Sequence, residues 1–216
     1  MTSMKYSATL AAYIQARIAE FDQIPESRVA ELRVLGDWVK NQQASQTPTS
    51  LNFICTHNSR RSHLAQIWAG VAARHFEIDN VDTFSGGTEA TAFHPNAVEA
   101  IRRCGFDVST EENPGTSSGE NPIYVVRTSP DSSPWRCFSK VYDQSPNPSA
   151  DFAAIMVCES ANAACPVVTG ASLKIPLPYV DPKISDGTDD ESATYDERCR
   201  QIAREMLFAF DKSNEF

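Results

Sequence analysis

The chain has 216 residues, of which 41% are apolar and 22% are charged, and its formal net charge is −9. This length suffices for the core of one medium-sized domain, and the acidic balance argues against nucleic acids and anionic membranes as partners. No run of 18 apolar residues and no N-terminal leader pattern occurs, so we expect a cytoplasmic protein without a membrane-spanning helix.

The first 50 residues (1–50) are predicted to form a helical extension. Apolar residues recur at helical spacing over 4–22, and Ser27 is expected to cap a second helix that leads into the polar linker 41–50. We expect the two helices to pack as a hairpin that serves as scaffold or as an oligomer contact. The catalytic domain is predicted to follow over 51–216.

Strand-like and helix-like patterns alternate through this second part. The expected strands are 51–55, 81–85, 151–158 and 173–178, and the expected helices are 62–76, 94–105 and 190–212. Gly86 and Gly87 are expected to form a turn, and Gly105 to end its helix. The alternation predicts a flavodoxin-like α/β fold, with a four-stranded parallel sheet and helices on both faces. Within an insertion at about 111–149, the runs 122–128 and 136–143 predict a β-hairpin.

A cysteine ends the first expected strand, and an arginine follows six residues later at the start of a helix, in the sequence CTHNSRRS (55–62). A loop in this position aims several backbone N–H groups at one point, which suits a tetrahedral oxyanion and stabilises a thiolate. We therefore predict that Cys55 is a nucleophile, that Arg61 grips two oxyanion oxygens, and that Ser62 donates a hydrogen bond to the sulfur. The predicted oxyanion-binding residues are Thr56, His57, Asn58, Ser59, Arg60 and Arg61.

A second candidate is Asp181, which precedes Pro182 in a late loop. A leaving oxygen needs a proton, and a carboxylic acid above the thiolate can supply it. An Asp-Pro pair alone indicates only a turn. Together with the cysteine–arginine loop it predicts that Asp181 is the general acid.

These residues resemble the low-molecular-weight protein tyrosine phosphatase superfamily, whose loop reads C-x-G-N-x-x-R-S and whose acid lies in a late Asp-Pro pair. The resemblance extends through 85–109 and covers roughly 51–110 and 150–212. The segment MVCESANAACP (156–166) is similar to the C-x6-C-P segment of the thioredoxin-coupled arsenate reductases, a branch of the same superfamily.

The resemblance implies a relay of three thiols. Cys55 attacks arsenate, and Asp181 protonates the departing oxygen. Cys158 then attacks Cys55 and releases arsenite, and Cys165 attacks Cys158 to carry the disulfide to the surface for thioredoxin. Arsenate reduction takes two electrons, so one thiol is not enough, whereas a phosphatase needs neither Cys158 nor Cys165.

The relay also predicts motion between its last two thiols. A helix over 158–165 would place Cys158 and Cys165 about 10.5 Å apart along its axis, whereas a disulfide needs Cα atoms roughly 4.4–6.8 Å apart. We therefore expect this segment to be mobile and to unwind on oxidation.

Several positions depart from the family pattern. His57 replaces the loop glycine, and Arg60, which replaces a cysteine of many relatives, is expected to point its side chain outward. Gln66 stands where some reductases have a glutamate linked to a potassium site, so we expect no potassium, and the absence of a C-x-x-C pair disfavours zinc. We expect no metal or other cofactor. His63, like His57, either tunes the anion affinity of the loop or is a solvated histidine.

Two other functions stay open. A phosphatase acting on phosphotyrosine or on a small phosphomonoester would use Cys55, Arg61 and Asp181 alone. The expected tyrosines after Pro182 are missing, which tilts against phosphotyrosine, although Phe93 is a candidate wall for a phenol slot. A non-catalytic oxyanion or arsenite redox sensor would need no general acid. The remaining cysteines are expected to be core thiols: Cys104, Cys137 and Cys199.

Overall fold

The computed structural model describes residues 5–114, 119–165 and 167–212. Small parts of the predicted extension and insertion, and Pro166 after Cys165, lie outside the described residues. In chain order the elements are α1 (Ala8–Ile18), η1 (Phe21–Gln23), α2 (Glu26–Ala44), β1 (Thr49–Cys55), α3 (Arg61–His75), β2 (Val81–Gly87), α4 (Pro95–Arg103), β3 (Asp107–Glu111), β4 (Ile123–Arg127), β5 (Trp135–Cys137), β6 (Phe152–Met156), α5 (Glu159–Ala164), β7 (Ala171–Pro176), η2 (Pro182–Ser185) and α6 (Glu191–Phe210).

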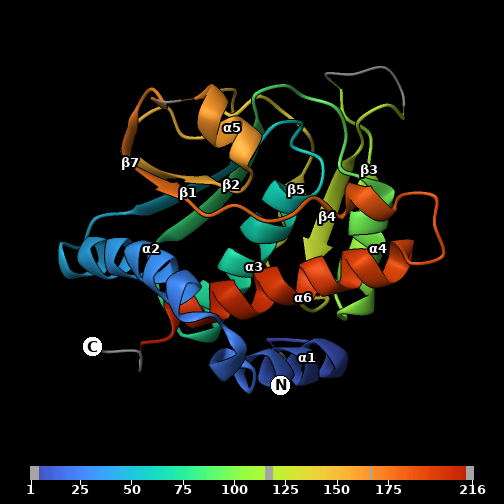
Figure 1. The fold of residues 1–216 in the computed structure, drawn as a ribbon, viewed down its shortest axis with the longest axis horizontal. Helices are drawn as coiled ribbons and strands as arrows, with labels where there is room; N and C mark the ends of the chain where they lie inside the picture. The colour runs from blue at the N-terminus through green and yellow to red at the C-terminus, as the bar shows by residue number, and fades with distance from the viewer. Residues whose placement is uncertain (1–4, 115–118, 166, 213–216) are drawn as a thin grey trace.

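The central sheet contains the four predicted strands, in the order β2-β1-β6-β7, and all its pairs are parallel. Helices flank it (Figure 1). Parallel strands buried on both faces carry continuous apolar runs, and every residue of β6 is buried. After β1 the chain forms β2 on one side of β1, and it later returns to form β6 on the other side of β1. Side chains at the carboxyl ends of β1 and β6 therefore meet at the point where ligands bind in such sheets.

Helix α3 forms the centre of the core, because it lies between the sheet and α6 (Figure 1). Each residue from Ser62 to Ala73 is buried. The ring of Trp68 packs against Tyr13 of α1 at 5.5 Å between ring centroids and meets Phe106 edge-on at 5.2 Å. The first residue of α3 directly follows the predicted oxyanion loop, so this packing fixes the loop from below.

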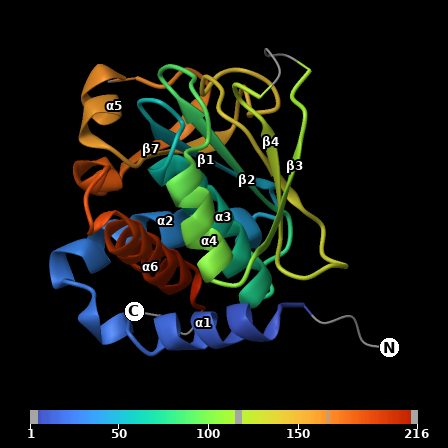
Figure 2. The same cartoon turned by 90° about the vertical axis from the view of Figure 1, so that its right-hand side faces the viewer.

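The two N-terminal helices are present, but three details of their prediction are wrong. Helix α2 begins at Glu26, so Ser27 lies within its first turn, and no side chain caps the helix. The helix also continues to Ala44, through the first four residues of the predicted linker, where Gln43 donates a hydrogen bond of 2.9 Å to the carbonyl oxygen of Asp79. Both helices pack mainly against α6 rather than against each other, so the predicted helical hairpin does not form (Figure 2).

The predicted hairpin forms as β4 and β5, which pair antiparallel, and β3 adds a third strand on the other side of β4. Strand β3 was not predicted, because four of its five residues are polar, most are exposed, and they show no apolar alternation. The second strand of the hairpin is shorter than expected. The chain after it runs beside β2, where Val141 pairs with Gly87, so the predicted turn at Gly86 and Gly87 is the end of a strand.

Gly105 ends α4 as predicted, directly after the C-cap residue Cys104 and with a φ of 101°. A Cβ atom there would lie 2.6 Å from the backbone nitrogen of Leu10, so both the dihedral angle and the packing of α1 require glycine. Within the described ranges, none of the helices combines the length and the apolar character needed to cross a bilayer.

Candidate active site

The segment between β1 and α3 forms a tight loop at the carboxyl edge of the sheet. Cys55 is the last residue of β1, is 3% exposed, and lies beside Gly87 of β2. Asn58 adopts a φ of 44°, which asparagine tolerates better than most residues. A Cβ atom on Gly87 would lie 2.6 Å from the carbonyl oxygen of Thr56 and 2.7 Å from the backbone nitrogen of Asn58. Glycine at this position therefore lets the loop curl over the strand end.

The loop is held by its carbonyl groups, which accept hydrogen bonds from outside it. The Cys55 and Thr56 carbonyl oxygens accept from the backbone N–H groups of Thr88 and Glu89, at 3.1 and 2.9 Å. The His57 carbonyl oxygen accepts from the hydroxyl groups of two further residues, which are Thr91 and Ser139. In the part of the chain that the structure describes, no backbone N–H group of 56–60 donates a hydrogen bond. These N–H groups form the kind of concave donor set that binds an oxyanion.

Asn58 and Ser62 connect the loop to the sulfur of Cys55. The side-chain amide of Asn58 donates to the hydroxyl oxygen of Ser62 at 2.9 Å, and that oxygen lies 3.1 Å from Sγ of Cys55. The amide oxygen of Asn58 in turn accepts from the backbone N–H of Lys140 at 3.0 Å. Asn58 donates to the Ser62 oxygen and so leaves the Ser62 hydroxyl proton free for the sulfur, and its donation to Cys55 stays a prediction.

Arg61 and Asp181 lie side by side although 120 residues separate them. Nη2 of Arg61 donates to Oδ2 of Asp181 at 2.6 Å, and Nη1 donates to the carbonyl oxygen of Tyr179 at 2.9 Å. The other oxygen of Asp181 accepts from the backbone N–H of Lys183 and caps η2. The fold thus brings the predicted acid and the predicted oxyanion-binding arginine together at the loop.

The expectation for the Arg60 side chain is wrong. This side chain does not point outward but is 11% exposed, because it packs under the loop after Asp181. Nε donates to the hydroxyl oxygen of Tyr195 at 2.6 Å, and Nη2 donates to the carboxylate of Asp186 at 3.0 Å. Tyr195 donates to the other oxygen of Asp186, and its burial raises its pKa to about 12. Arg60 therefore ties the oxyanion loop to the acid-bearing loop.

The two histidines have different surroundings. The His57 side chain is 48% exposed, and its Nε2 lies 3.2 Å from a carboxylate oxygen of Glu89. His63 is fully buried in α3, with Nδ1 3.1 Å from the Ser85 hydroxyl and its ring stacked on Phe93 at 4.1 Å. Burial lowers the pKa of His63 well below its usual value, so its ring is neutral. Of the two alternatives for His63, the solvated one is therefore wrong.

The candidate phenol wall does not form. Phe93 is 1% exposed and packs against His63 and Tyr124 in the interior. Tyr179, the aromatic residue just before Asp181, is 4% exposed and also turns inward. Neither ring lines an open slot beside the loop.

Cys158 adjoins the loop, and Cys165 lies at the far end of α5. The Cys158 sulfur is 3.5 Å from the hydroxyl oxygen of Thr56, the residue after Cys55, and the thiol is 1% exposed. Cys158 is the N-cap residue of α5, and Cys165 is its C-cap residue and is partly exposed. Lys174 of β7 donates to the carbonyl oxygen of Cys165 at 2.7 Å. The segment between the two cysteines is helical, so they cannot form a disulfide unless α5 unwinds. This unwinding stays a prediction.

Lys140 was not predicted as part of the site, but the insertion places it against the loop, where its backbone N–H donates to Asn58. Lys140 is only 4% exposed, and its Nζ donates to the carbonyl oxygen of Phe138. Burial lowers the pKa of this lysine to about 8. No sequence signal could have identified it, because a single lysine in a polar stretch is usually exposed.

The other three cysteines are buried, as expected. The sulfur atoms of Cys104 and Cys199 lie 3.6 Å apart between α4 and α6, and the indole N–H of Trp68 donates to Cys199 at 3.2 Å. Cys137 is fully buried, and desolvation raises its pKa to about 12. Among the described residues, no group of three or more His, Cys, Asp or Glu side chains is arranged to hold a metal ion.

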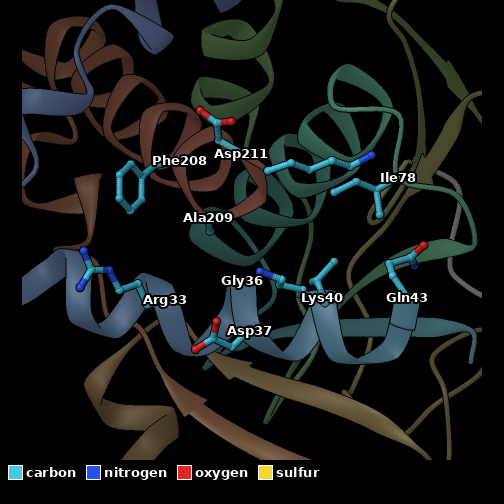
Figure 3. Close-up of a pocket in the computed structure, with 11 residues that line it drawn as sticks. Arg33, Gly36, Asp37, Lys40, Gln43, Ile78, Phe208, Ala209 and Asp211 are labelled. Atoms are coloured by element: carbon cyan, nitrogen blue, oxygen red, sulfur yellow. The ribbon is translucent and has the colours of Figure 1, made fainter. Parts of the chain in front are cut away.

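A separate cavity of about 460 Å³ opens between α2 and the carboxyl end of α6 (Figure 3). Side chains of both charge signs line it, among them Arg33, Asp37 and Lys40 of α2 and Asp211 after α6. None of the predicted site residues contributes to its wall. The candidate active site is therefore the loop at the sheet edge rather than this cavity.

No protein-family model matches the chain. An arsenate reductase from Bacillus licheniformis is 26% identical over 166 residues, which cover 77% of this chain and 97% of the relative. An arsenate reductase from Bacillus subtilis is 26% identical over 163 residues, which cover 76% of this chain and 95% of the relative. A low-molecular-weight phosphotyrosine phosphatase structure from Vibrio cholerae aligns with a TM-score of 0.50 and 14% identity, covering 77% of this chain and 97% of its own.

Proposed function

We propose that this chain, an enzyme of the low-molecular-weight phosphatase and arsenate reductase family, reduces arsenate through three cysteines that thioredoxin recharges. In this proposal Cys55 is the nucleophile, Cys158 and Cys165 form the relay, and Asp181 is the general acid. The relay requires a reducing compartment, which we take to be the cytoplasm.

Binding comes first. The unpaired N–H groups of 56–60 and the Arg61 guanidinium form one positive site beside the Cys55 sulfur, and arsenate is a tetrahedral anion of matching shape. To take hold of the anion, Arg61 has to share or release the carboxylate of Asp181, which now occupies its Nη2. Asp181 is thereby placed at the rim of the site, where an oxygen would leave.

The first chemical step forms a bond between the Cys55 sulfur and arsenic. The thiolate is stabilised by the Ser62 hydroxyl, and an arsenate oxygen leaves as water after Asp181 donates a proton. Arsenic is still pentavalent in this thioester-like adduct, so no electrons have been exchanged up to this point.

The second step transfers the electrons. Cys158 attacks the Cys55 sulfur, the sulfur–arsenic bond breaks, and its electron pair leaves with arsenic as arsenite. The thiols together lose two electrons and become a Cys55–Cys158 disulfide, so arsenate and two thiols give arsenite, one disulfide and water. Cys165 then attacks Cys158, which frees Cys55 and leaves a Cys158–Cys165 disulfide for the dithiol of thioredoxin to reduce.

One observation carries the proposal. The Cys158 sulfur lies 3.5 Å from the hydroxyl group of Thr56, so a buried second thiol contacts the oxyanion loop at the residue that follows Cys55. A phosphatase has no use for this thiol. The inward positions of Phe93 and Tyr179 also disfavour the phosphotyrosine alternative, because no open aromatic slot supports a phenol ring. The presence of Asp181 against Arg61 disfavours the non-catalytic sensor, because binding needs no acid.

The test is arsenate turnover by the full chain with thioredoxin, thioredoxin reductase and NADPH. Wild type is expected to consume NADPH only when arsenate is present. Cys158→Ser is expected to lose multiple turnover while it keeps hydrolysis of para-nitrophenyl phosphate, and Cys137→Ser serves as a matched control for loss of a buried thiol. Arsenate-independent NADPH consumption, or full activity of Cys158→Ser, would exclude the relay.

A further inference from the structure

Arg28, near the start of α2 in the N-terminal extension, reaches across to the loop that precedes Asp181. Its guanidinium carbon lies 4.6 Å above the ring centroid of Tyr179. Its Nε donates to the carboxylate of Glu205 at 2.8 Å, and its Nη1 donates to Glu31 at 2.7 Å. The Arg28 side chain is 12% exposed and that of Glu205 is 1% exposed. The contact is thus a buried one between α2, α6 and the Tyr179 loop.

Tyr179 faces the Arg28 guanidinium with its ring, and Glu205 lies close enough to its hydroxyl group to help raise the pKa of that group, which burial raises most. Its hydroxyl oxygen and Nη2 of Arg28 are both buried and without a hydrogen-bond partner among the described residues. A guanidinium stacks on an aromatic face through its flat, weakly hydrated surface, which an ammonium lacks. Replacement of Arg28 would therefore remove the flat cation against which the Tyr179 ring packs.

The backbone of Tyr179 carries this position into the active site. Its carbonyl oxygen accepts from Nη1 of Arg61 at 2.9 Å, and its N–H donates to the carbonyl oxygen of Val157 at 3.1 Å. Val157 directly precedes Cys158, and Asp181 lies two residues after Tyr179. Tyr179 thus connects the arginine of the oxyanion loop, the acid and the segment between β6 and α5 that bears the second thiol.

We propose that Arg28 is a positioning residue of the oxyanion site, which acts through Tyr179 to hold the Arg61 guanidinium in its binding orientation. The N-terminal extension is then part of the machinery rather than a scaffold alone. From the proposed function, this inference takes only one element, which is that Arg61 binds the oxyanion. Loss of the stacking face lets Tyr179 shift, and its carbonyl group then no longer fixes one edge of the guanidinium.

The test is the dissociation constant of inorganic phosphate, measured by calorimetry on the full chain. Arg28→Met is expected to raise this constant about tenfold, because small displacements of a binding group are costly. Arg28→Lys keeps a cation for Glu205 but removes the planar face, so it is expected to raise the constant about threefold. If Arg28→Met does not fold, the phosphate dissociation constant of Arg28→Lys still tests the inference.

The chain supplies a matched control in Arg17 of α1. Its guanidinium lies 4.5 Å from the ring centroid of Tyr13 and bonds to Glu20, so it makes the same kind of contact. Tyr13 reaches α3 only by packing on Trp68, seven residues after Arg61, whereas Tyr179 is hydrogen-bonded to Arg61 itself. Arg17→Met is expected to lower the unfolding midpoint as Arg28→Met does but to leave phosphate binding unchanged. The inference is overturned if the Arg28 variants bind phosphate as wild type does, or if Arg17→Met weakens binding equally.

Phosphate binding separates this inference from the proposed function. If phosphate affinity depends on Arg28 but arsenate supports no NADPH consumption, the reductase proposal fails and the positioning role stands. If arsenate is reduced and the Arg28 variants bind phosphate with unchanged affinity, only the positioning role fails.

Discussion

Nη2 of Arg61 donates a hydrogen bond of 2.6 Å to Oδ2 of Asp181. The arginine that would bind the oxyanion and the acid that would protonate its leaving group thus neutralise each other when no anion is bound. The Asp181 side chain is 30% exposed and that of Arg61 is 12% exposed, so the carboxylate is the partner that can swing away. An incoming anion therefore competes with Asp181 for one edge of the guanidinium.

The first prediction follows from this competition. Asp181→Asn is expected to lower kcat for arsenate by about 10²-fold or more, because a general acid typically contributes this much. The same change is expected to tighten phosphate binding, because the neutral amide competes less well for Arg61. Steady-state turnover and calorimetry measure the two effects. The control is Asp189→Asn, which removes one exposed charge from the same loop, and weaker phosphate binding by Asp181→Asn would contradict the prediction.

The second prediction separates the adjacent arginines. Arg61→Met is expected to weaken phosphate binding about 10²-fold, because a bidentate charged contact is lost. Arg60→Met is expected to change it much less, since the Arg60 side chain binds Asp186 and Tyr195 instead of facing the anion. Arg60→Met is expected to lower kcat instead, because the loop that carries Asp181 is then held less firmly. Calorimetry with phosphate compares the two variants directly, and equal losses of affinity would refute this division of roles.

The third prediction concerns Lys174, whose ammonium binds the Asn162 and Cys165 carbonyl oxygens at the end of α5. A cation at a helix carboxyl terminus stabilises the helix, and α5 has to unwind before its two end thiols can join. Lys174→Met is therefore expected to speed formation of the Cys158–Cys165 disulfide about fivefold, for a contact worth ~1 kcal/mol.

Acid-quenched samples, mapped by mass spectrometry after arsenate addition, give this rate. The map has to distinguish the relay disulfide from a bond between Cys104 and Cys199, whose sulfur atoms are only 3.6 Å apart. Lys174→Arg keeps the charge and serves as the control. A rate that is unchanged or slower in Lys174→Met would show that α5 opening does not limit this step.

The fourth prediction is a pH dependence of stability set by Lys140. Its pKa is lowered to about 8 in the folded chain from 10.5, so between these values the unfolded chain binds more protons and wild-type stability rises with pH. Below pH 8 the buried Lys140 stays charged, which lowers the free energy of unfolding by about 3 kcal/mol. Lys140→Met is expected to be more stable than wild type at pH 7, by an amount that shrinks as pH rises toward 10.

Urea unfolding of both proteins at pH 7, 8, 9 and 10 measures this difference. The exposed Lys5 provides the control, because Lys5→Met is expected to show a small difference that does not vary in this way. If the gap between wild type and Lys140→Met stays constant with pH, the lysine is not desolvated as the structure indicates.

Patterns that depend on neighbouring residues could be read from the sequence. The apolar run of β1 and the apolar spacing of α3 indicated the two ends of the oxyanion loop. The four central strands followed from short apolar runs separated by helices. By contrast, β3 is polar and exposed and forms only because β4 offers it a partner, so no local pattern predicts it.

The direction of a charged side chain was not readable either. Arg60 was expected to face solvent, as most arginines do, but Asp186 and Tyr195 supply partners from a distant loop and a distant helix. The inward turns of Phe93 and His63 likewise depend on each other's rings rather than on their own neighbours in sequence.

The sequence by itself determined that a cysteine, a loop and an arginine lie between a buried strand and a helix, because consecutive residues and hydrophobic periodicity suffice for that. Only the tertiary structure decided what surrounds Cys55. Asp181, Cys158 and Arg28 come from separate segments, and packing alone places them around the loop. Their positions depend on how α2, α6 and the sheet bury their apolar faces together, and that free energy belongs to the whole chain rather than to any one segment.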